Sequence, residues 1–453
     1  MPSVLPRRLA LGGLSLLLLG AAGLAARPTT RLEPAPAVAQ DDPPAPVARR
    51  RRQIELDDPP AREETVEFLV NGEGGASQRK GTSWKVQYAR GTHKGLYITG
   101  AWFKRDLQED WIKVLEDARI AELFVPYHQS YQTRYFDLNG FSFPLAMVQQ
   151  EDAGPTGTIL PKFEGDEYPR VVKEIRDRGV AWKDWGNGVR RGKEMVLWSG
   201  LQAGNYMYLM QYGFQDDGTI TFRAGATGQN LPGARQEPHM HNAHWRVDID
   251  LADGKKNDAM LMKHSEDPSQ LTAEDTEEAF NSGVEGGIDW DPKEFTMVRI
   301  VSQKTNANGK RISYDMVPAL RHGSARHAEK FTQHDFWVSK SHPERPLEKL
   351  FSNLPTIVKD TESVEQTDVV LWYTSSSHHE PRDEDGKGTP RTTNRQWYFD
   401  DGWEGSALVM WSGFDLKPRN LFDRTPFYPY APPPPPPVRP RGDGAAAPIE
   451  VGN

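Results

Sequence analysis

Three of the chain's twelve histidines lie within six residues, at His239, His241 and His244 of the stretch EPHMHNAHWRVDID. This stretch is predicted to be a β-strand, in which side chains two positions apart share a face. His239 and His241 therefore point the same way, and His244 points the opposite way. Two imidazoles on one face supply half of a nitrogen-donor metal site, although an isolated His-x-His pair more often decorates a solvated strand.

A third imidazole is available from the stretch TDVVLWYTSSSHHEPRDED, where His378 and His379 follow a strongly β-like run. Either can complete a three-histidine site across a sheet. Imidazole ligands with open coordination positions suit copper or zinc, and copper generally binds more tightly. The chain has no cysteine, which excludes thiolate zinc sites, iron–sulfur clusters, disulfides and cysteine nucleophiles. Spacing alone leaves open whether this is a metal site and which histidine completes it.

The elements that must position these histidines are mostly strands. Short alternating runs such as KGLYITGAWF, DGTITFRAGAT, HWRVDIDL and DVVLWYT are separated by Gly, Asn and Asp. Asp-Gly in DDGTI and Asn-Gly at 308–309 are typical of hairpin turns. Helix-like patterns occur only at residues 168–179 and in TAEDTEEAFNSG at 272–283. The sequence predicts an all-β fold, a large antiparallel β-sandwich with few short helices.

The 453 residues are predicted to contain one folded body between two disordered ends. Residues 1–26 combine a basic start with an apolar run and small residues, which is typical of a secretory signal peptide. Residues 27–64, rich in Pro, Ala and Arg, predict a linker, residues 65–430 the body, and residues 431–453 a Pro-rich tail. We therefore expect an exported protein with no membrane contact beyond that apolar run.

The charge balance argues against one class of partner. The chain has 55 basic and 63 acidic residues, a formal net charge of −8. A sequence-independent nucleic-acid binder is usually strongly basic, so nucleic acid is not an expected partner.

Several separated blocks of the body resemble one enzyme family and follow its order. The blocks are KGLYITGAWFKRD, IAELFVPYHQSYQTRYFDLNG, GNYMYLMQYGFQDDGTITFRAGATG, HMHNAHWRVDID, FTQHDFWVS, TDVVLWYTSSSHHEPRDED and GFDLKPRNLFDRTP. Together they resemble the catalytic domain of the copper amine oxidases, which contain topaquinone, a quinone made from a tyrosine of the chain. The resemblance covers nearly the whole body and implies that domain's β-sandwich fold.

The resemblance implies a ligand set and a cofactor. His239 and His241 match the family's two strand ligands of copper, and His379, in His-x-Pro-Arg, matches the third. Tyr206, in the sequence Gly-Asn-Tyr, matches the tyrosine that becomes topaquinone, with Asn205 before it. Copper beside a phenol can activate dioxygen and hydroxylate the ring.

Three further residues match the family's reaction machinery. Asp137, in Tyr-Phe-Asp, matches the base that removes the α-proton from the amine–quinone Schiff base. This role needs a raised pKa, which partial burial supplies. Tyr135 matches the residue that gates the quinone, and Tyr127 matches the tyrosine that hydrogen-bonds a quinone oxygen.

A second, peripheral metal site is expected from acidic residues. Asp248 and Asp250 share a strand face, and Asp368 lies in the neighbouring TDVV run. Carboxylates with backbone carbonyls form a hard-oxygen site suited to calcium. The family carries such a site at the matching positions, with carbonyls from Ile249 and Val369; surface acids on strands are the alternative.

Some positions depart from the family pattern. Met207 stands where an acidic residue usually follows the cofactor tyrosine, and Gln202 replaces the usual threonine. The sequence EDGKG lacks the tryptophan expected after the third histidine, and a linker-like segment stands where small N-terminal domains are usual. These departures bear on the rate of cofactor formation and on the freedom of the ring to turn.

The expected reaction is oxidative deamination, in which a primary amine, water and dioxygen give an aldehyde, ammonia and hydrogen peroxide. Two alternatives stay open. One is a three-histidine copper or zinc protein in which Tyr206 is unmodified, and the other is an inactive exported copper-binding protein on a decayed oxidase scaffold. A homodimer is expected, because the family pairs its catalytic domains.

Overall fold

The computed structural model describes residues 58–427, with gaps at the segments named next. The undescribed segments within this range are 70–80, 128–133, 140–142, 185–187, 204–205, 230–236, 253, 268, 271, 320–326, 343–349, 383–389, 394–395 and 400–405. The predicted signal peptide and tail, and the EDGKG segment, lie outside the described residues. The first strand begins at Arg62, so the predicted linker is a few residues too long.

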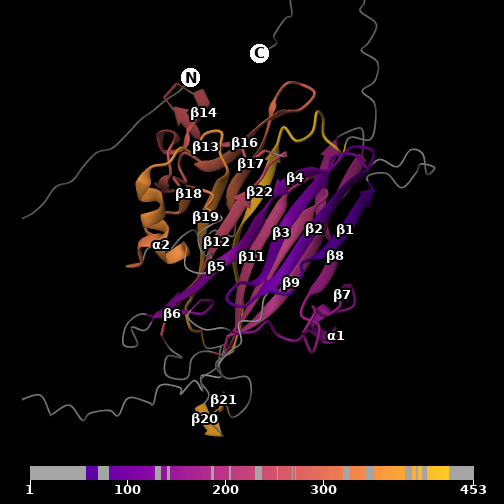
Figure 1. The fold of residues 1–453 in the computed structure, drawn as a ribbon, viewed down its shortest axis with the longest axis vertical. Helices are drawn as coiled ribbons and strands as arrows, with labels where there is room; N and C mark the ends of the chain where they lie inside the picture. The colour runs from indigo at the N-terminus through magenta and orange to yellow at the C-terminus, as the bar shows by residue number, and fades with distance from the viewer. Residues whose placement is uncertain are drawn as a thin grey trace, which may run out of the picture. The chain divides into compact units, whose positions relative to one another are not determined.

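The first sheet brings together strands from both halves of the chain (Figure 1). In spatial order it contains β1 (Arg62–Leu69), β2 (Gly81–Gly91), β3 (Gly95–Lys104), β5 (Asp117–Pro126), β12 (His239–Ile249), β19 (Val369–His379), β18 (Phe336–Lys340) and β15 (Gly286–Ile288). Two short strands extend it, β4 (Ile112–Leu115) beside β3 and β6 (Arg134–Phe136) beside β5. Neighbouring strands are antiparallel, and β12 and β19 pair although 130 residues separate their starts along the chain.

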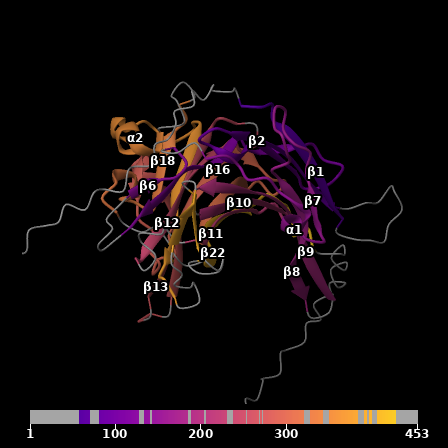
Figure 2. The ribbon, with the colours of Figure 1, turned by 90° about the horizontal axis from the view of Figure 1, so that it is seen from below.

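The second sheet is also antiparallel, and Figure 2 shows its curved strands from below. Its order is β14 (Thr272–Ala279), β13 (Asn257–Asp267), β16 (Met297–Thr305), β17 (Arg311–Ala319), β22 (Ser406–Arg419), β11 (Ile220–Gln229), β10 (Tyr206–Gln215), β9 (Gly188–Ala203), β8 (Val172–Asp184) and β7 (Gly157–Ile159). A separate pair consists of β20 (Pro390–Thr393) and β21 (Gln396–Phe399). Both predicted hairpin turns are confirmed, between β10 and β11 and between β16 and β17.

Aromatic side chains fill the space between the two sheets. Phe214 of β10 packs on Trp84 of β2, with ring centroids 5.3 Å apart. Phe222 of β11 and Phe414 of β22 each lie 5.7 Å from Trp245 of β12. Burying one such side chain stabilises the fold by about 1.5–3 kcal/mol, so large rings compensate for the modest apolar content. The predicted antiparallel β-sandwich is confirmed.

A second cluster covers the outer face of the first sheet beside β5, β12 and β19. It includes Leu354 of α2 (Leu350–Ile357), Phe331 of a 3-10 turn (Lys330–Thr332), and Phe124, Val370 and Trp372 of the sheet. Figure 1 shows α2 beside these strands. The strand β12 is consequently buried on both faces, which explains how its polar residues become inaccessible to water.

The two predicted helices are wrong. Residues 172–184 form β8, which pairs along its length with β9, and residues 272–279 form β14, which pairs with β13. Both segments carry charged residues at helix-like spacing, but hydrogen bonding to a long neighbouring strand outweighs local helix propensity. Besides α2, the described helices are α1 (Gln150–Ala153) and 3-10 turns at Phe280–Gly283, Lys330–Thr332 and Val358–Asp360.

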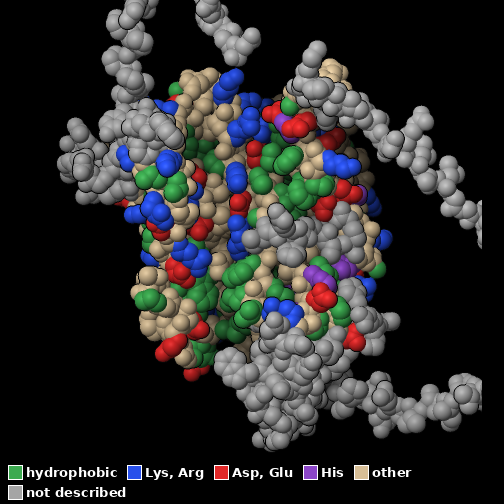
Figure 3. Space-filling model, turned by 180° about the vertical axis from the view of Figure 1, so that it is seen from behind, with side chains coloured by type: hydrophobic (Ala, Val, Ile, Leu, Met, Phe, Trp, Pro, Cys, Tyr) green, Lys and Arg blue, Asp and Glu red, His purple; other side chains and the backbone are tan. Residues whose placement is uncertain are grey.

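Charged side chains of both signs are interspersed on the face seen in Figure 3. Cross-strand ion pairs join Arg191 to Asp177 and Arg223 to Asp415. Among the described helices, none is long and apolar enough to cross a membrane.

Candidate active site

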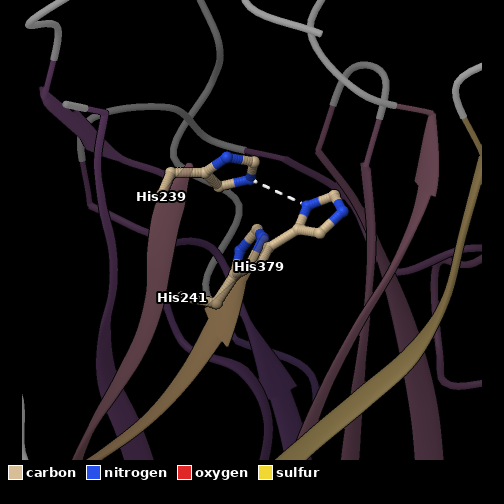
Figure 4. Close-up of side chains that lie close together, drawn as sticks. All are labelled: His239, His241 and His379. Atoms are coloured by element: carbon tan, nitrogen blue, oxygen red, sulfur yellow. Dashed lines mark hydrogen bonds between the residues drawn. The ribbon is translucent and has the colours of Figure 1, made fainter. Parts of the chain in front are cut away.

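The antiparallel register of β12 and β19 brings three histidines to one point between the sheets. His239 lies directly opposite His379 in the ladder, and His241 follows two residues along the same strand face. His239 Nε2 lies 3.2 Å from His379 Nδ1. All three side chains are buried, and Figure 4 shows their rings converging. The third imidazole that the metal hypothesis required is therefore present.

The other two histidines of these strands lie outside the cluster. His378, next to His379 on β19, is exposed. His244 lies on the far side of β12, where it stacks on Trp372 with ring centroids 5.7 Å apart and pairs with the Thr374 hydroxyl at 2.7 Å. Burial lowers the pKa of His244 to about 3, so this ring is a neutral packing residue.

The chemistry of the three histidines fits a divalent metal. His241 Nε2 is buried and has no hydrogen-bond partner among the described residues. Burial, and then the neighbouring His239 and His379, hold the pKa of His241 well below its usual range, so the ring is neutral and can donate a lone pair. His239 Nδ1 lies 2.9 Å from the Glu237 carbonyl, which can only accept, so the proton is on Nδ1 and Nε2 directs its lone pair toward Tyr206 and His379.

Tyr206 points from the second sheet into the histidine cluster. It is the first residue of β10 and only 5% exposed. Its Oη lies 3.0 Å from His239 Nε2 and 3.0 Å from His379 Nδ1. A metal held by these nitrogens would lie within reach of the phenol oxygen. Asn205, predicted to assist the cofactor, lies outside the described residues.

Tyr127 and Tyr135 lie at the edge of the cluster. Tyr127 forms an isolated bridge with His239 and stacks on its ring, with centroids 4.3 Å apart. Tyr135 of β6 meets Tyr127 edge to face at 5.8 Å and is partly exposed. The predicted gate and the predicted hydrogen-bonding tyrosine are thus neighbours, and their roles toward a quinone stay predictions.

Asp137 is held by a residue that the sequence analysis did not single out. Asp137 follows β6 and accepts a hydrogen bond of 2.6 Å from the Tyr208 hydroxyl. Burial raises the pKa of Asp137 to about 6, although the Tyr208 bond acts in the opposite direction. Tyr208 lies two positions after Tyr206, so strand alternation could have placed both rings on the site face.

The departures from the family pattern near Tyr206 lie on the other face of the sheet. Met207 pairs with Gln202 across β9 and β10. Met207 is partly exposed and Gln202 is exposed. Alternation therefore directs both side chains away from the histidines.

The carboxylates of the predicted calcium site lie in one region, where each already pairs with a cation. Asp248 forms an ion pair with Arg246 at 2.9 Å, Asp250 with Lys113 at 2.8 Å, and Asp368 with Lys255 at 3.4 Å. The two predicted carbonyl donors, Ile249 and Val369, lie opposite each other in the ladder between β12 and β19. Burial raises the pKa of Asp248 to about 6, against the effect of Arg246. Calcium at this place stays a prediction.

One other group of described residues has metal-ligating geometry, namely Glu285, His342 and Glu362. His342 Nε2 lies 3.0 Å from Glu362, and Lys340 Nζ lies 3.1 Å from the same carboxylate. The Lys340 backbone N–H also donates to Glu285 at 2.8 Å, so both carboxylates of this group already have protein partners.

We expect His379→Ala to remove most of the bound copper and His378→Ala to leave it unchanged. The register sends His379 into the cluster, whereas His378 points to solvent. Copper per chain, measured after dialysis against a weak chelator, distinguishes the two variants. Equal loss in both, or loss in His378→Ala alone, would contradict the register.

Comparison with known proteins gives a consistent result. The sequence model of the copper amine oxidase enzyme domain matches residues 172–433. The chain is 26% identical over 327 residues to the primary amine oxidase of Klebsiella aerogenes, covering 59% of this chain and 38% of that protein. It is 24% identical over 382 residues to the histamine oxidase of Arthrobacter globiformis, covering 69% and 51%.

Solved structures show the same fold. A copper-containing benzylamine oxidase from Hansenula polymorpha superposes with a TM-score of 0.60 at 17% identity, over 76% of this chain and 60% of that chain. An Aspergillus nidulans amine oxidase gives 0.58 at 18% identity, over 76% and 52%. The chain thus spans about half the length of the curated relatives it matches. The matched domain range begins after Tyr127, Tyr135 and Asp137, so the family model does not bear on these three residues.

Proposed function

The chain belongs to the copper amine oxidase family, and from this premise we propose that it oxidises primary amines with copper and a quinone made from its own Tyr206. The products are an aldehyde, ammonia and hydrogen peroxide. The proposal includes copper at His239, His241 and His379, and the base role of Asp137.

One observation supports this function above the others. Tyr206 Oη lies 3.0 Å from His239 Nε2 and 3.0 Å from His379 Nδ1, two nitrogens of the three-histidine cluster. A tyrosine that only packs in the core has no need to place its hydroxyl among three buried imidazoles. This contact favours an oxidisable tyrosine over a plain three-histidine metal protein.

The roles of the chain's own residues follow from their surroundings. When bound, copper supplies dioxygen activation, and the quinone supplies an electrophilic carbonyl for the amine. Asp137 receives the proton from the substrate's α-carbon, and the Tyr208 hydroxyl keeps one carboxylate oxygen in place. The buried sheet residues around Tyr206 exclude bulk water from the ring.

The experiment is a visible absorption spectrum of the copper-loaded protein before and after phenylhydrazine. The proposed function requires a quinone band that the hydrazine bleaches, together with amine-dependent peroxide production. Copper binding without that band would leave a three-histidine metal protein. Neither copper nor a band would leave an inactive scaffold.

We expect the rate of anaerobic quinone reduction by saturating amine to rise with pH through about 6 and then to level off. The pKa of Asp137 is raised to about 6 by burial, so below that pH the carboxyl is protonated and cannot accept a proton. Each further pH unit downward should lower the rate roughly tenfold. Stopped-flow absorbance across this range checks the profile. A flat rate on both sides of pH 6 would contradict the assignment.

The proposal also covers location and assembly. We propose export directed by residues 1–26, and a homodimer in solution. N-terminal sequencing of the secreted protein and its mass by light scattering test these two statements.

A further inference from the structure

Glu122, in the middle of β5, is a fully buried carboxyl group with no basic partner among the described residues. Its side chain accepts three backbone N–H groups instead. Oε1 accepts from Leu123 at 2.9 Å, from Leu138 at 2.8 Å and from Asn139 at 3.2 Å. The residue is 0% exposed. Burial raises the pKa of Glu122 to about 7, while these backbone bonds lower it.

Two of these three hydrogen bonds hold the segment that follows Asp137, the proposed base. Leu138 and Asn139 directly follow Asp137, and the Asp137 N–H donates to the Leu123 carbonyl at 2.8 Å. The Asn139 side chain donates to the Ala121 carbonyl. Pairing of β6 with β5 ends at Phe136, one residue before Asp137. Beyond the strand, the backbone around Asp137 is held by contacts with β5 and by the His93 ring, whose Nδ1 lies 3.1 Å from the Leu138 carbonyl.

We propose that Glu122 is a positioning residue for amine oxidation, holding the backbone after β6 so that the Asp137 carboxylate stays against Tyr208. This inference rests on the proposed function. Glu122 does not touch the substrate or the cofactor tyrosine; it acts through Leu138 and Asn139.

The length of the side chain makes the inference testable without removing a charge or an acceptor. Glu122→Asp withdraws the carboxylate by one carbon–carbon bond, about 1.5 Å. Misplacement of a catalytic group by about 1 Å can cost roughly 10²-fold, so we expect quinone reduction to slow by about 10–100-fold. Glu122→Gln keeps both the length and a carbonyl at the Oε1 position, and should stay within about threefold of wild type.

Anaerobic stopped-flow reduction by an amine and by its α-deuterated form measures the affected step. Copper content and the yield and rate of the phenylhydrazine adduct should be unchanged, because trapping the carbonyl needs no proton removal from carbon. In Glu122→Asp the deuterium isotope effect should be at least as large as in wild type. A merely structural role would lower adduct yield and reduction together.

Asp216→Asn is a control for disturbing a buried carboxylate that holds backbone elsewhere in the fold. Asp216 accepts the Lys193 N–H at 2.7 Å and lies at the opposite end of β10 from Tyr206. We expect a lower melting temperature in this variant and an unchanged reduction rate.

Four results would overturn the inference: wild-type reduction in Glu122→Asp, a parallel loss of adduct, equal impairment in Glu122→Gln, or slowed reduction in the control. If Glu122→Asp does not fold, Asn139→Ala is tested in its place, because it removes the hydrogen bond from the Asn139 side chain to the Ala121 carbonyl. An unchanged rate of quinone reduction in Asn139→Ala would also overturn the inference. Failure of the proposed function is seen separately, as a wild-type protein that forms no quinone.

Discussion

Replacing Tyr206 with phenylalanine is expected to leave copper bound and to abolish both the quinone band and amine oxidation. Phenylalanine preserves the ring that packs beside His241, at a centroid distance of 4.8 Å, and removes only the oxygen that lies between His239 and His379. The proposed copper ligands are the imidazoles of His239, His241 and His379, so the Tyr206→Phe variant keeps all three. Copper content, the visible spectrum and amine-dependent peroxide are measured on the same preparation.

Tyr212→Phe provides the matched control on the same strand and face. Tyr212 is fully buried, and its hydroxyl donates to the Leu96 carbonyl at 2.9 Å, far along β10 from the histidines. Its loss should cost about 1 kcal/mol of stability and leave the quinone unchanged. Amine-dependent peroxide from Tyr206→Phe would show that no quinone from this tyrosine is needed, and would favour a plain metal centre.

Replacing Asp137 with asparagine should leave quinone formation intact and slow its reduction by amine by roughly 10²–10⁴-fold. Asparagine keeps the shape of the side chain and an oxygen for the Tyr208 hydroxyl, which now donates to Asp137 Oδ2 at 2.6 Å. It cannot accept the α-proton. Because building the cofactor requires copper and dioxygen rather than this base, the loss should fall on the reductive half-reaction.

Phenylhydrazine separates the two outcomes for Asp137→Asn. The adduct should still form at normal yield, whereas single-turnover reduction by amine should be slow and should lose the step near pH 6. Near-normal reduction would mean that Asp137 is a structural residue at the end of β6 and that the base lies elsewhere. The same Asp-to-Asn change at Asp216 controls for the loss of a buried carboxylate.

Strand periodicity by itself determined much of the site. A two-residue repeat requires His239 and His241 to share a face and His244 to take the other, because successive side chains alternate across any strand. A separate local signal, the Asp217-Gly218 pair, predicted the hairpin between β10 and β11. Resemblance to the family supplied the roles of these residues, which periodicity cannot give.

Other features were decided only by tertiary pairing. The segments 172–184 and 272–279 have helix-like spacing but are strands, because β9 and β13 offer a complete ladder of hydrogen bonds. The placement of His379 against His239 depends on a ladder between segments far apart in the chain, which local sequence does not encode.

Contacts between segments also revealed the roles of two residues that the sequence analysis did not single out. Tyr208 and Glu122 each look like ordinary strand residues in the sequence. Only the packing of β10 and the turn after β6 shows that one holds the Asp137 carboxylate and the other its backbone. The sequence thus determined which faces carry the ligands, whereas three-dimensional proximity decided which groups meet, because hydrogen bonds across sheets join residues without regard to their separation along the chain.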